Sequence, residues 1–259
     1  MRELITMWRH TKMVVLVALT AAVYAAAIIP LKPIPLIPGL TELRPGSVVP
    51  VVCSLLFGPA AAWGAAFGNL IGDLFGTLGP GSFFGFIGNF LYGYLPYRIW
   101  RSFRAGGHTS GRDLVRYLAA ALAASLACGM MIGWGIDLLG FAPFAALGNI
   151  ILVNNLLSSV VLGPILIRAL GPRVERLGLV YTDLLAPEDR SEGRYRKIGL
   201  VLLWIGLVGG IVVGNLLSIG VYRAGVFAAG FTSGGAGKMG VGYGLMPFIL
   251  LMVIGALLV

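Results

Sequence analysis

The sequence predicts an all-α polytopic membrane protein, and three observations lead to this fold class. Of the 259 residues, 58% are hydrophobic and only 11% are charged, whereas average soluble chains are about one quarter charged. Apolar runs long enough to cross a bilayer as helices recur along the chain. The net charge of +9 fits the excess of Lys and Arg on the cytoplasmic side of membrane proteins, so no nucleic-acid partner is expected.

Apolar length and periodicity predict about eight transmembrane helices. They are residues 12–30, 45–58, 60–78, 82–100, 114–138, 142–168, 198–222 and 242–259. The first has an apolar core longer than the roughly 7–15 residues of a signal peptide, so we expect it to be retained. The chain then divides into a six-helix core at 1–170, a cytoplasmic linker at 171–197 and a C-terminal transmembrane hairpin at 198–259.

The distribution of cationic residues predicts the orientation. With the N-terminus in the cytoplasm, only four of the 19 Lys and Arg residues lie outside: Lys32, Arg44, Arg223 and Lys238. Such a bias sets the topology of membrane proteins. The span at 45–58 is short for a hydrocarbon core of about 30 Å, but without it the five arginines from Arg98 to Arg116 would lie outside. We therefore expect a plasma-membrane protein with a cytoplasmic N-terminus.

The segment from Pro30 to Gly46 contains five prolines and cannot be a regular helix. Irregular backbone at membrane depth is tolerated only where protein buries it or a wet cavity receives it. This segment is predicted to lie outside, where it carries Glu42 and Arg44. The outer half of the molecule is therefore the candidate site. A second outer loop, 224–242, is glycine-rich and is interpreted as a connector, with a mobile lid as the alternative.

Three predicted helices carry small residues at every fourth position. The rows are Gly64, Gly68, Gly72 and Gly76; Ala18, Ala22 and Ala26; and Gly206, Gly210 and Gly214. Such rows let helix backbones approach closely in lipid. We expect the glycine rows to be helix contact surfaces first of all.

A polar row runs beside the first glycine row, in the stretch FGNLIGDLFG and just beyond it. Asn69, Asp73 and Thr77 are four residues apart and share one helix face. A carboxylate in lipid costs several kcal/mol, so Asp73 must face a partner or a cavity. Gly-Asn also occurs at Asn89, Asn149 and Asn215, where an interhelical hydrogen bond worth about 1 kcal/mol is the simplest interpretation of each.

Taken together, these polar groups and several aromatic residues fall at similar outer depth on different helices. Aromatic faces with a few amide and carboxylate groups are typical of a small-molecule pocket. The predicted substrate-binding residues are Glu42, Arg44, Asn69, Asp73, Phe86, Asn89, Trp134 and Asn149. The alternative for one pair is a structural Asp73–Arg44 contact with no ligand nearby. Cys53 and Cys128 are interpreted as buried apolar residues, and no metal site or cofactor is predicted.

The chain resembles the substrate-binding S components of energy-coupling factor (ECF) transporters. The resemblance covers roughly residues 1–170 and rests mainly on LLFGPAAAWGAAFGNLIGDLFGTLGPGSFFGFIGNFLYGYLPYRIW, Leu55 to Trp100, with the preceding alanine row and proline-rich loop. It implies a subunit that captures a vitamin-like compound from outside. It also implies docking on a transmembrane T component through Ala18, Ala22 and Ala26, and two cytoplasmic ATPases that supply energy.

The chain itself has no GxxxxGK[ST] sequence, so ATP hydrolysis is assigned to the partners and the protein is not expected to be an enzyme. The stretch ELRPGSVVP, Glu42 to Pro50, resembles the queuosine-precursor group of S components. Riboflavin, folate and pantothenate stay open as ligands. The two spans after residue 198 depart from the six-helix pattern of the resemblance.

Two other functions are compatible with the composition. A stand-alone proton- or ion-coupled transporter could use Asp73 and Asp137 as proton carriers. An integral membrane enzyme is less well supported, because no predicted span contains a histidine and no Ser/His or HExxH arrangement occurs.

Overall fold

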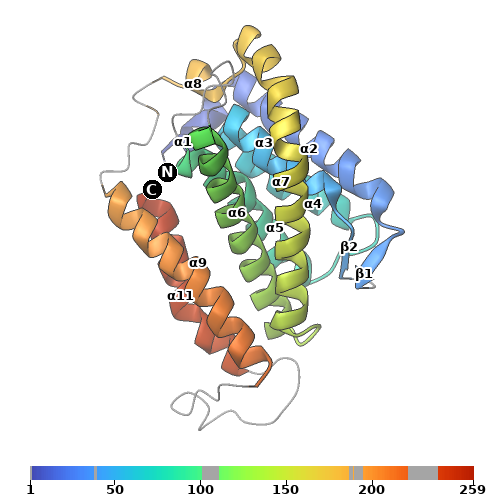
Figure 1. The fold of residues 1–259 in the computed structure, drawn as a ribbon. Helices are drawn as coiled ribbons and strands as arrows, with labels where there is room; N and C mark the ends of the chain where they lie inside the picture. The colour runs from blue at the N-terminus through green and yellow to red at the C-terminus, as the bar shows by residue number, and fades with distance from the viewer. Residues whose placement is uncertain (1, 38–39, 101–110, 187–188, 190–194, 221–238) are drawn as a thin grey trace.

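The computed structural model describes residues 2–37, 40–100, 111–186, 189, 195–220 and 239–259. These residues are helical apart from loops and one two-stranded hairpin, as Figure 1 shows. The protein is therefore an all-α polytopic membrane protein, as predicted. Arg223, Lys238 and most of the glycine-rich loop predicted at 224–242 lie outside the described residues.

The elements follow one another closely in the first part of the chain. They are α1 Glu3–Thr6, η1 Met7–Arg9, α2 Thr11–Ile28, η2 Ile29–Leu31, β1 Pro35–Ile37, β2 Thr41–Glu42, η3 Pro45–Ser47, α3 Val48–Phe57, α4 Pro59–Asp73 and α5 Gly81–Ile99. Longer helices follow: α6 Gly111–Leu138, α7 Phe144–Arg176, α8 Tyr181–Leu184, α9 Arg196–Ser218 and α11 Met239–Leu258.

A helix forms at each of the eight predicted spans, but not all of them have the length and hydropathy of a membrane span. Within the described residues, five segments do: Thr11–Leu31, Gly111–Leu138, Phe144–Leu184, Arg196–Ser218 and Gly240–Leu258. The helices α3 and α4 have only 10 and 15 residues. The crossings predicted at 45–58, 60–78 and 82–100 therefore stay predictions.

Two element boundaries differ from those predicted. Helix α4 ends at Asp73 and not at residue 78, because Gly76 adopts a φ of 132°, which side-chain-bearing residues rarely tolerate, and Gly79-Pro80 follows. Helix α7 continues to Arg176, past the predicted end of the core at residue 170. The proline-rich segment is non-helical, as predicted, apart from two short 3-10 turns, and β1 pairs antiparallel with β2.

Gly64, Gly68 and Gly72 of α4 pack against α2, which confirms that this part of the glycine row is a contact surface. Gly76, the fourth predicted member, lies beyond the end of α4, and an added Cβ atom there would meet nothing within 4 Å. A Cβ atom at Gly64 would lie 2.5 Å from Cβ of Thr20, and one at Gly68 would lie 2.9 Å from the carbonyl oxygen of Ala21. Both distances are too short for a real side chain, so only glycine permits this helix spacing. The alanine row of α2 lies on the opposite side of that helix, where Ala18, Ala22 and Ala26 are exposed.

The C-terminal helices α9 and α11 form an antiparallel hairpin that lies along one side of the bundle (Figure 1). Gly206 of α9 approaches the backbone of α11, where an added Cβ atom would be 2.5 Å from the amide nitrogen of Met252. The hairpin packs on α6 and α7, whereas α2 packs on α3 and α4. The hairpin and the exposed alanine row are therefore on different sides of the bundle.

Candidate functional site

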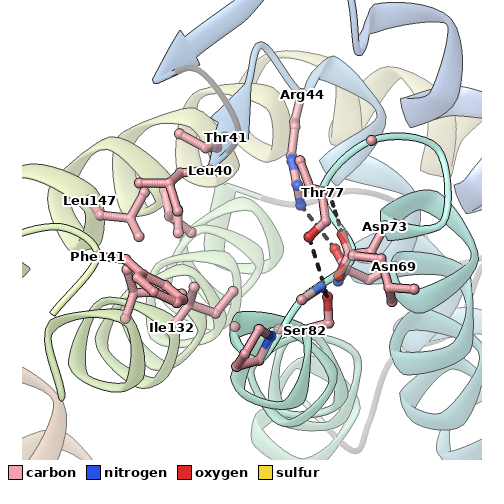
Figure 2. Close-up of a pocket in the computed structure, with 18 residues that line it drawn as sticks. Leu40, Thr41, Arg44, Asn69, Asp73, Thr77, Ser82, Ile132, Phe141 and Leu147 are labelled. Atoms are coloured by element: carbon pink, nitrogen blue, oxygen red, sulfur yellow. Dashed lines mark hydrogen bonds between the residues drawn. The ribbon is translucent and has the colours of Figure 1, made fainter. Parts of the chain in front are cut away.

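A cavity of about 320 Å³ lies between the proline-rich segment and helices α4 to α7. Figure 2 shows its two sides: Arg44, Asn69, Asp73, Thr77 and Ser82 on one, and Leu40, Ile132, Phe141 and Leu147 on the other. One side is therefore polar and charged, and the other is apolar. This division is typical of small-molecule sites, in which a few polar groups orient a ligand within an apolar pocket.

The polar side is a continuous hydrogen-bonded chain of side chains. The Nη1 atom of Arg44 donates to Oδ1 of Asn69 at 2.9 Å, and Nδ2 of Asn69 donates to Oδ2 of Asp73 at 3.2 Å. The hydroxyl of Thr77 donates to Oδ1 of Asp73 at 3.0 Å. The polar row predicted on α4 therefore forms one connected network, although Thr77 lies just beyond the end of the helix.

Asp73 also has a cationic partner that sequence reasoning did not select. Lys32 Nζ lies 3.9 Å from Oδ1 of Asp73 and donates to the Thr77 hydroxyl at 2.6 Å. The side chains of Lys32 and Asp73 are 9% and 7% exposed, so this ion pair is largely removed from water. The carboxylate thus has both a protein partner and a cavity, the two environments that make a charge at this position tolerable.

The proline-rich segment is held against α7 by contacts to the backbone of Arg44. The amide of Arg44 donates to Oδ1 of Asn154 at 3.2 Å, and the hydroxyl of Ser158 donates to the carbonyl oxygen of Arg44 at 3.0 Å. Asn154 and Ser158 are four residues apart on one face of α7. These two bonds fix the backbone from which the guanidinium reaches Asn69. A Cβ atom at Gly85 would lie 3.0 Å from Nδ2 of Asn69, so the glycine makes room for this chain.

Thr41 lines the cavity and was also missed by sequence reasoning. Its side chain is 3% exposed, and its Oγ1 atom has no hydrogen-bond partner among the described residues. A buried hydroxyl without a partner costs about 1–3 kcal/mol. Because Thr41 lines the cavity, a ligand group could satisfy this hydroxyl. No sequence pattern marks it, since the surrounding segment has no helical or strand periodicity.

The apolar side comes from the end of α6, the turn after it and the start of α7. These elements contribute Ile132, Ile136, Phe141, Leu147 and Ile151, which join Leu40 of the proline-rich segment. Each pair on a helix is four residues apart, so each helix turns one face to the cavity. In the sequence these positions cannot be distinguished from ordinary core residues, and only the packing of α6 against α7 brings them to the site.

Four of the predicted substrate-binding residues do not line the cavity. Asn89 accepts a hydrogen bond from the Tyr24 hydroxyl at 2.9 Å and donates to the carbonyl oxygen of Gly85 at 2.9 Å. The ring of Phe86 packs edge-on against Phe67, with centroids 5.4 Å apart. These contacts join α5 to α2 and to α4. A ligand-binding role for Asn89 and Phe86 stays a prediction that the described contacts do not favour.

The other two lie on the side of α6 and α7 that meets the C-terminal hairpin. Trp134 Nε1 donates to the carbonyl oxygen of Gly242 at 2.9 Å. Asn149 Nδ2 donates to Oδ1 of Asn215 at 2.6 Å. Glu42 lies in β2, and its side chain is outside the described part of the structure. The cavity therefore unites three of the eight predicted residues, Arg44, Asn69 and Asp73.

Comparison with known families identifies the family of this chain. A family model described as QueT transporter matches residues 14–172, which is more than half of the chain and includes every residue of the cavity wall. The chain belongs to the QueT transporter family. QueT transporters are ECF S components for queuosine precursors, so the resemblance inferred from Leu55 to Trp100 is confirmed. No curated protein and no solved structure matches the chain.

Membership in the QueT family makes this chain a membrane transport protein and gives it a transport role rather than a catalytic one. The matched segment ends at residue 172. The hairpin of α9 and α11, which begins at Arg196, therefore lies outside the part that the QueT family model describes.

Proposed function

We propose that this protein captures a queuosine precursor in the cavity from the outer face of the plasma membrane. It then delivers the ligand through an ECF complex with a T component and two cytoplasmic ATPases. The observation that carries the proposal is the cavity of about 320 Å³, with Arg44, Asn69 and Asp73 in its wall, inside the segment that matches QueT transporters.

The chemistry of the cavity suits a flat nucleobase-like ligand. The edge of such a base alternates N–H donors with carbonyl or ring-nitrogen acceptors. Arg44 offers donors, Asp73 offers acceptors and Asn69 offers both, so the polar side can read such an edge. The opposite side, with Phe141 and Leu147, can cover a flat face or an apolar substituent. The volume lies at the lower end of the range for ligand pockets, about 300–1,000 Å³.

The exposed alanine row supports the docking part of the proposal. Ala18, Ala22 and Ala26 face outward from α2, with the exposed apolar side chains of Val15 and Leu19 beside them. Small residues let a partner helix approach the backbone closely. The C-terminal hairpin packs on α6 and α7, so it leaves this face open to a T component (Figure 1).

The described contacts do not favour a proton-coupled transporter that works alone. Asp137 was one of its two candidate proton carriers, and its Oδ2 atom accepts a hydrogen bond from the amide of Phe144 at 2.7 Å. This contact satisfies a backbone donor at the start of α7, which is a structural task. Asp73, the other candidate, is held by Lys32, Asn69 and Thr77.

A ligand panel tests the capture step. The purified protein in lipid nanodiscs is heated with queuine, riboflavin, folate or pantothenate, and each compound that shifts the melting temperature is titrated by calorimetry. Queuine is expected to raise Tm and bind, because a ligand specific for the native state stabilises it. If no compound on the panel shifts Tm, the capture proposal is wrong.

Co-purification tests the docking step. Replacing Ala22 with Leu should prevent close approach of a partner helix, so the T component and ATPases should no longer co-purify while queuine binding persists. Val23→Leu, at an exposed position of the same helix outside the alanine row, is the comparison variant and should keep both the partners and queuine binding. If Ala22→Leu abolished ligand binding but kept the partners, the roles assigned to α2 and the cavity would be reversed.

A further inference from the structure

Helices α6 and α7 have two opposite faces near the turn that joins them. One face lines the cavity, through Ile132 and Ile136 on α6 and Leu147 on α7. On this face, Ile132 and Ile136 also lie beside Gly88 and Gly81 of α5. The position of this wall therefore depends both on α5 and on the elements that pack against the other face of α6 and α7.

The other face of α6 carries a second row of residues, and this row contacts the C-terminal hairpin. Trp134 donates its indole N–H to the carbonyl oxygen of Gly242. Met130 and Leu138, four residues to either side of Trp134, lie against Gly210 and Gly242. The two rows on α6 are offset by two residues, so the hairpin contacts and the cavity contacts belong to different sides of one helix.

The contacts on α7 are polar and reciprocal. Asn149 donates to Asn215 at 2.6 Å, and Asn215 donates back to Oδ1 of Asn149 at 3.2 Å. Nearby, the amide of Ala145 donates to the hydroxyl of Ser218 at 3.0 Å. Gly214 allows the fully buried ring of Phe144 to approach α9, since an added Cβ atom would lie 2.5 Å from Cε1 of that ring.

We infer that the C-terminal hairpin braces the apolar wall of the cavity and so sets ligand affinity through residues that never touch the ligand. Trp134, Asn149 and Asn215 are the positioning residues. The inference rests on the proposed function for its ligand, but the geometry of the wall can be measured without one. It also gives a role to α9 and α11, which lie beyond the segment shared with QueT transporters.

A distance measurement across the empty cavity tests the brace directly. Spin labels are placed at Leu78→Cys and Phe141→Cys, two exposed wall positions, in full-length protein in nanodiscs with Cys53 and Cys128 replaced by alanine. The brace variant is Trp134→Phe with Asn215→Ala, which removes the indole donor and the amide pair but keeps a ring beside Phe84. Val212→Ala, on the exposed side of α9, is the control.

The distance distribution is expected to broaden in the brace variant and to stay unchanged in the Val212→Ala control. An unchanged distribution in a folded brace variant overturns the inference. If the double variant does not fold, Trp134→Phe alone is used, because it removes one hydrogen bond and keeps an aromatic ring. Circular dichroism melts establish the temperature below which each variant is fully folded.

Queuine affinity, measured below that temperature in unlabelled protein, tests the second part of the inference, that the hairpin sets ligand affinity. The brace variant should bind queuine roughly tenfold more weakly, which corresponds to a loss of about 1.4 kcal/mol of binding free energy. Unchanged affinity in the folded variant overturns the claim that the brace sets affinity. If the wild-type protein does not bind queuine at all, the proposed function fails, and the distance distribution still decides whether the hairpin braces the wall.

Discussion

Helices α4 and α9 carry the same sequence pattern but use it differently. Each has glycines at every fourth position, and in each an asparagine follows a glycine of the row, at Asn69 and at Asn215. Both glycine rows permit close packing, of α4 on α2 and of α9 on α11, α6 and α7. The two helices differ in what their asparagines contact. Asn69 lines the cavity and accepts a hydrogen bond from Arg44, whereas Asn215 forms hydrogen bonds with Asn149.

The difference comes from the element that faces each asparagine. Asn215 meets another amide on a packed helix, and the two side chains hydrogen-bond to each other. Asn69 meets a guanidinium from the proline-rich segment, which cannot pack as a helix and leaves a cavity beside it. The position four residues further on is Asp73 at the end of α4 and Ile219 just after α9, so only α4 extends its polar row toward a ligand.

The largest effect is expected from Asp73→Asn. This change removes the carboxylate charge of α4, which has no counterpart at the corresponding position after α9. It removes one anionic partner from Lys32, whose side chain is only 9% exposed, and the apo protein should lose about 3 kcal/mol of stability. The measurement is the free energy of unfolding together with queuine affinity. Glu175→Gln, at an exposed acid near the end of α7, is the matched control. Reduced affinity at unchanged stability would instead identify Asp73 as a direct ligand contact.

A slightly smaller effect is expected from Gly64→Val, which tests the glycine row of α4. The added Cβ atom would lie 2.5 Å from Cβ of Thr20, and such overpacking typically costs about 1–3 kcal/mol. The melting temperature should fall, as differential scanning calorimetry will show. Ala22→Val adds bulk on the exposed face of α2 and should leave Tm unchanged. Equal behaviour of the two variants would contradict the assignment of the buried contact.

A matched pair of asparagine variants separates the cavity from helix packing. Asn69→Ala should weaken queuine binding by about 1–2 kcal/mol, because it removes a cavity group that also orients Arg44. Asn89→Ala should instead lower apo Tm with affinity unchanged, because Asn89 bonds Tyr24 and Gly85. Calorimetric titration and melting of both variants decide this. A loss of affinity at constant Tm in Asn89→Ala would support the ligand role predicted for it from sequence.

The smallest effect is expected from Thr41→Val, which keeps the side-chain shape and removes the unpartnered hydroxyl. Apo stability should be unchanged or slightly higher, since no described hydrogen bond is lost. The binding free energy of queuine should weaken by about 1 kcal/mol if the ligand forms a hydrogen bond with the Thr41 hydroxyl. Isothermal titration of Thr41→Val beside Thr41→Ser measures this difference. Equal affinities would show that Thr41 is a shape-filling wall residue only.

The sequence alone determined the fold class, the place of each long helix and the use of the α4 glycine row. These features follow from local quantities: apolar length, proline content and the four-residue spacing that puts Gly64 and Gly68 on one face. Asp73 was identifiable for the same reason, because a carboxylate in an apolar run needs a partner wherever the helix packs.

The composition of the cavity was decided only by the tertiary structure. Asn89, Trp134 and Asn149 were predicted to share the depth of the cavity residues, yet each turns to a protein partner, because the rotation of a helix is set by its neighbours and not by its own spacing. Lys32 and Thr41 reach the site from an aperiodic segment. Hydropathy gives the depth of a residue in the membrane, but only packing determines what that residue faces.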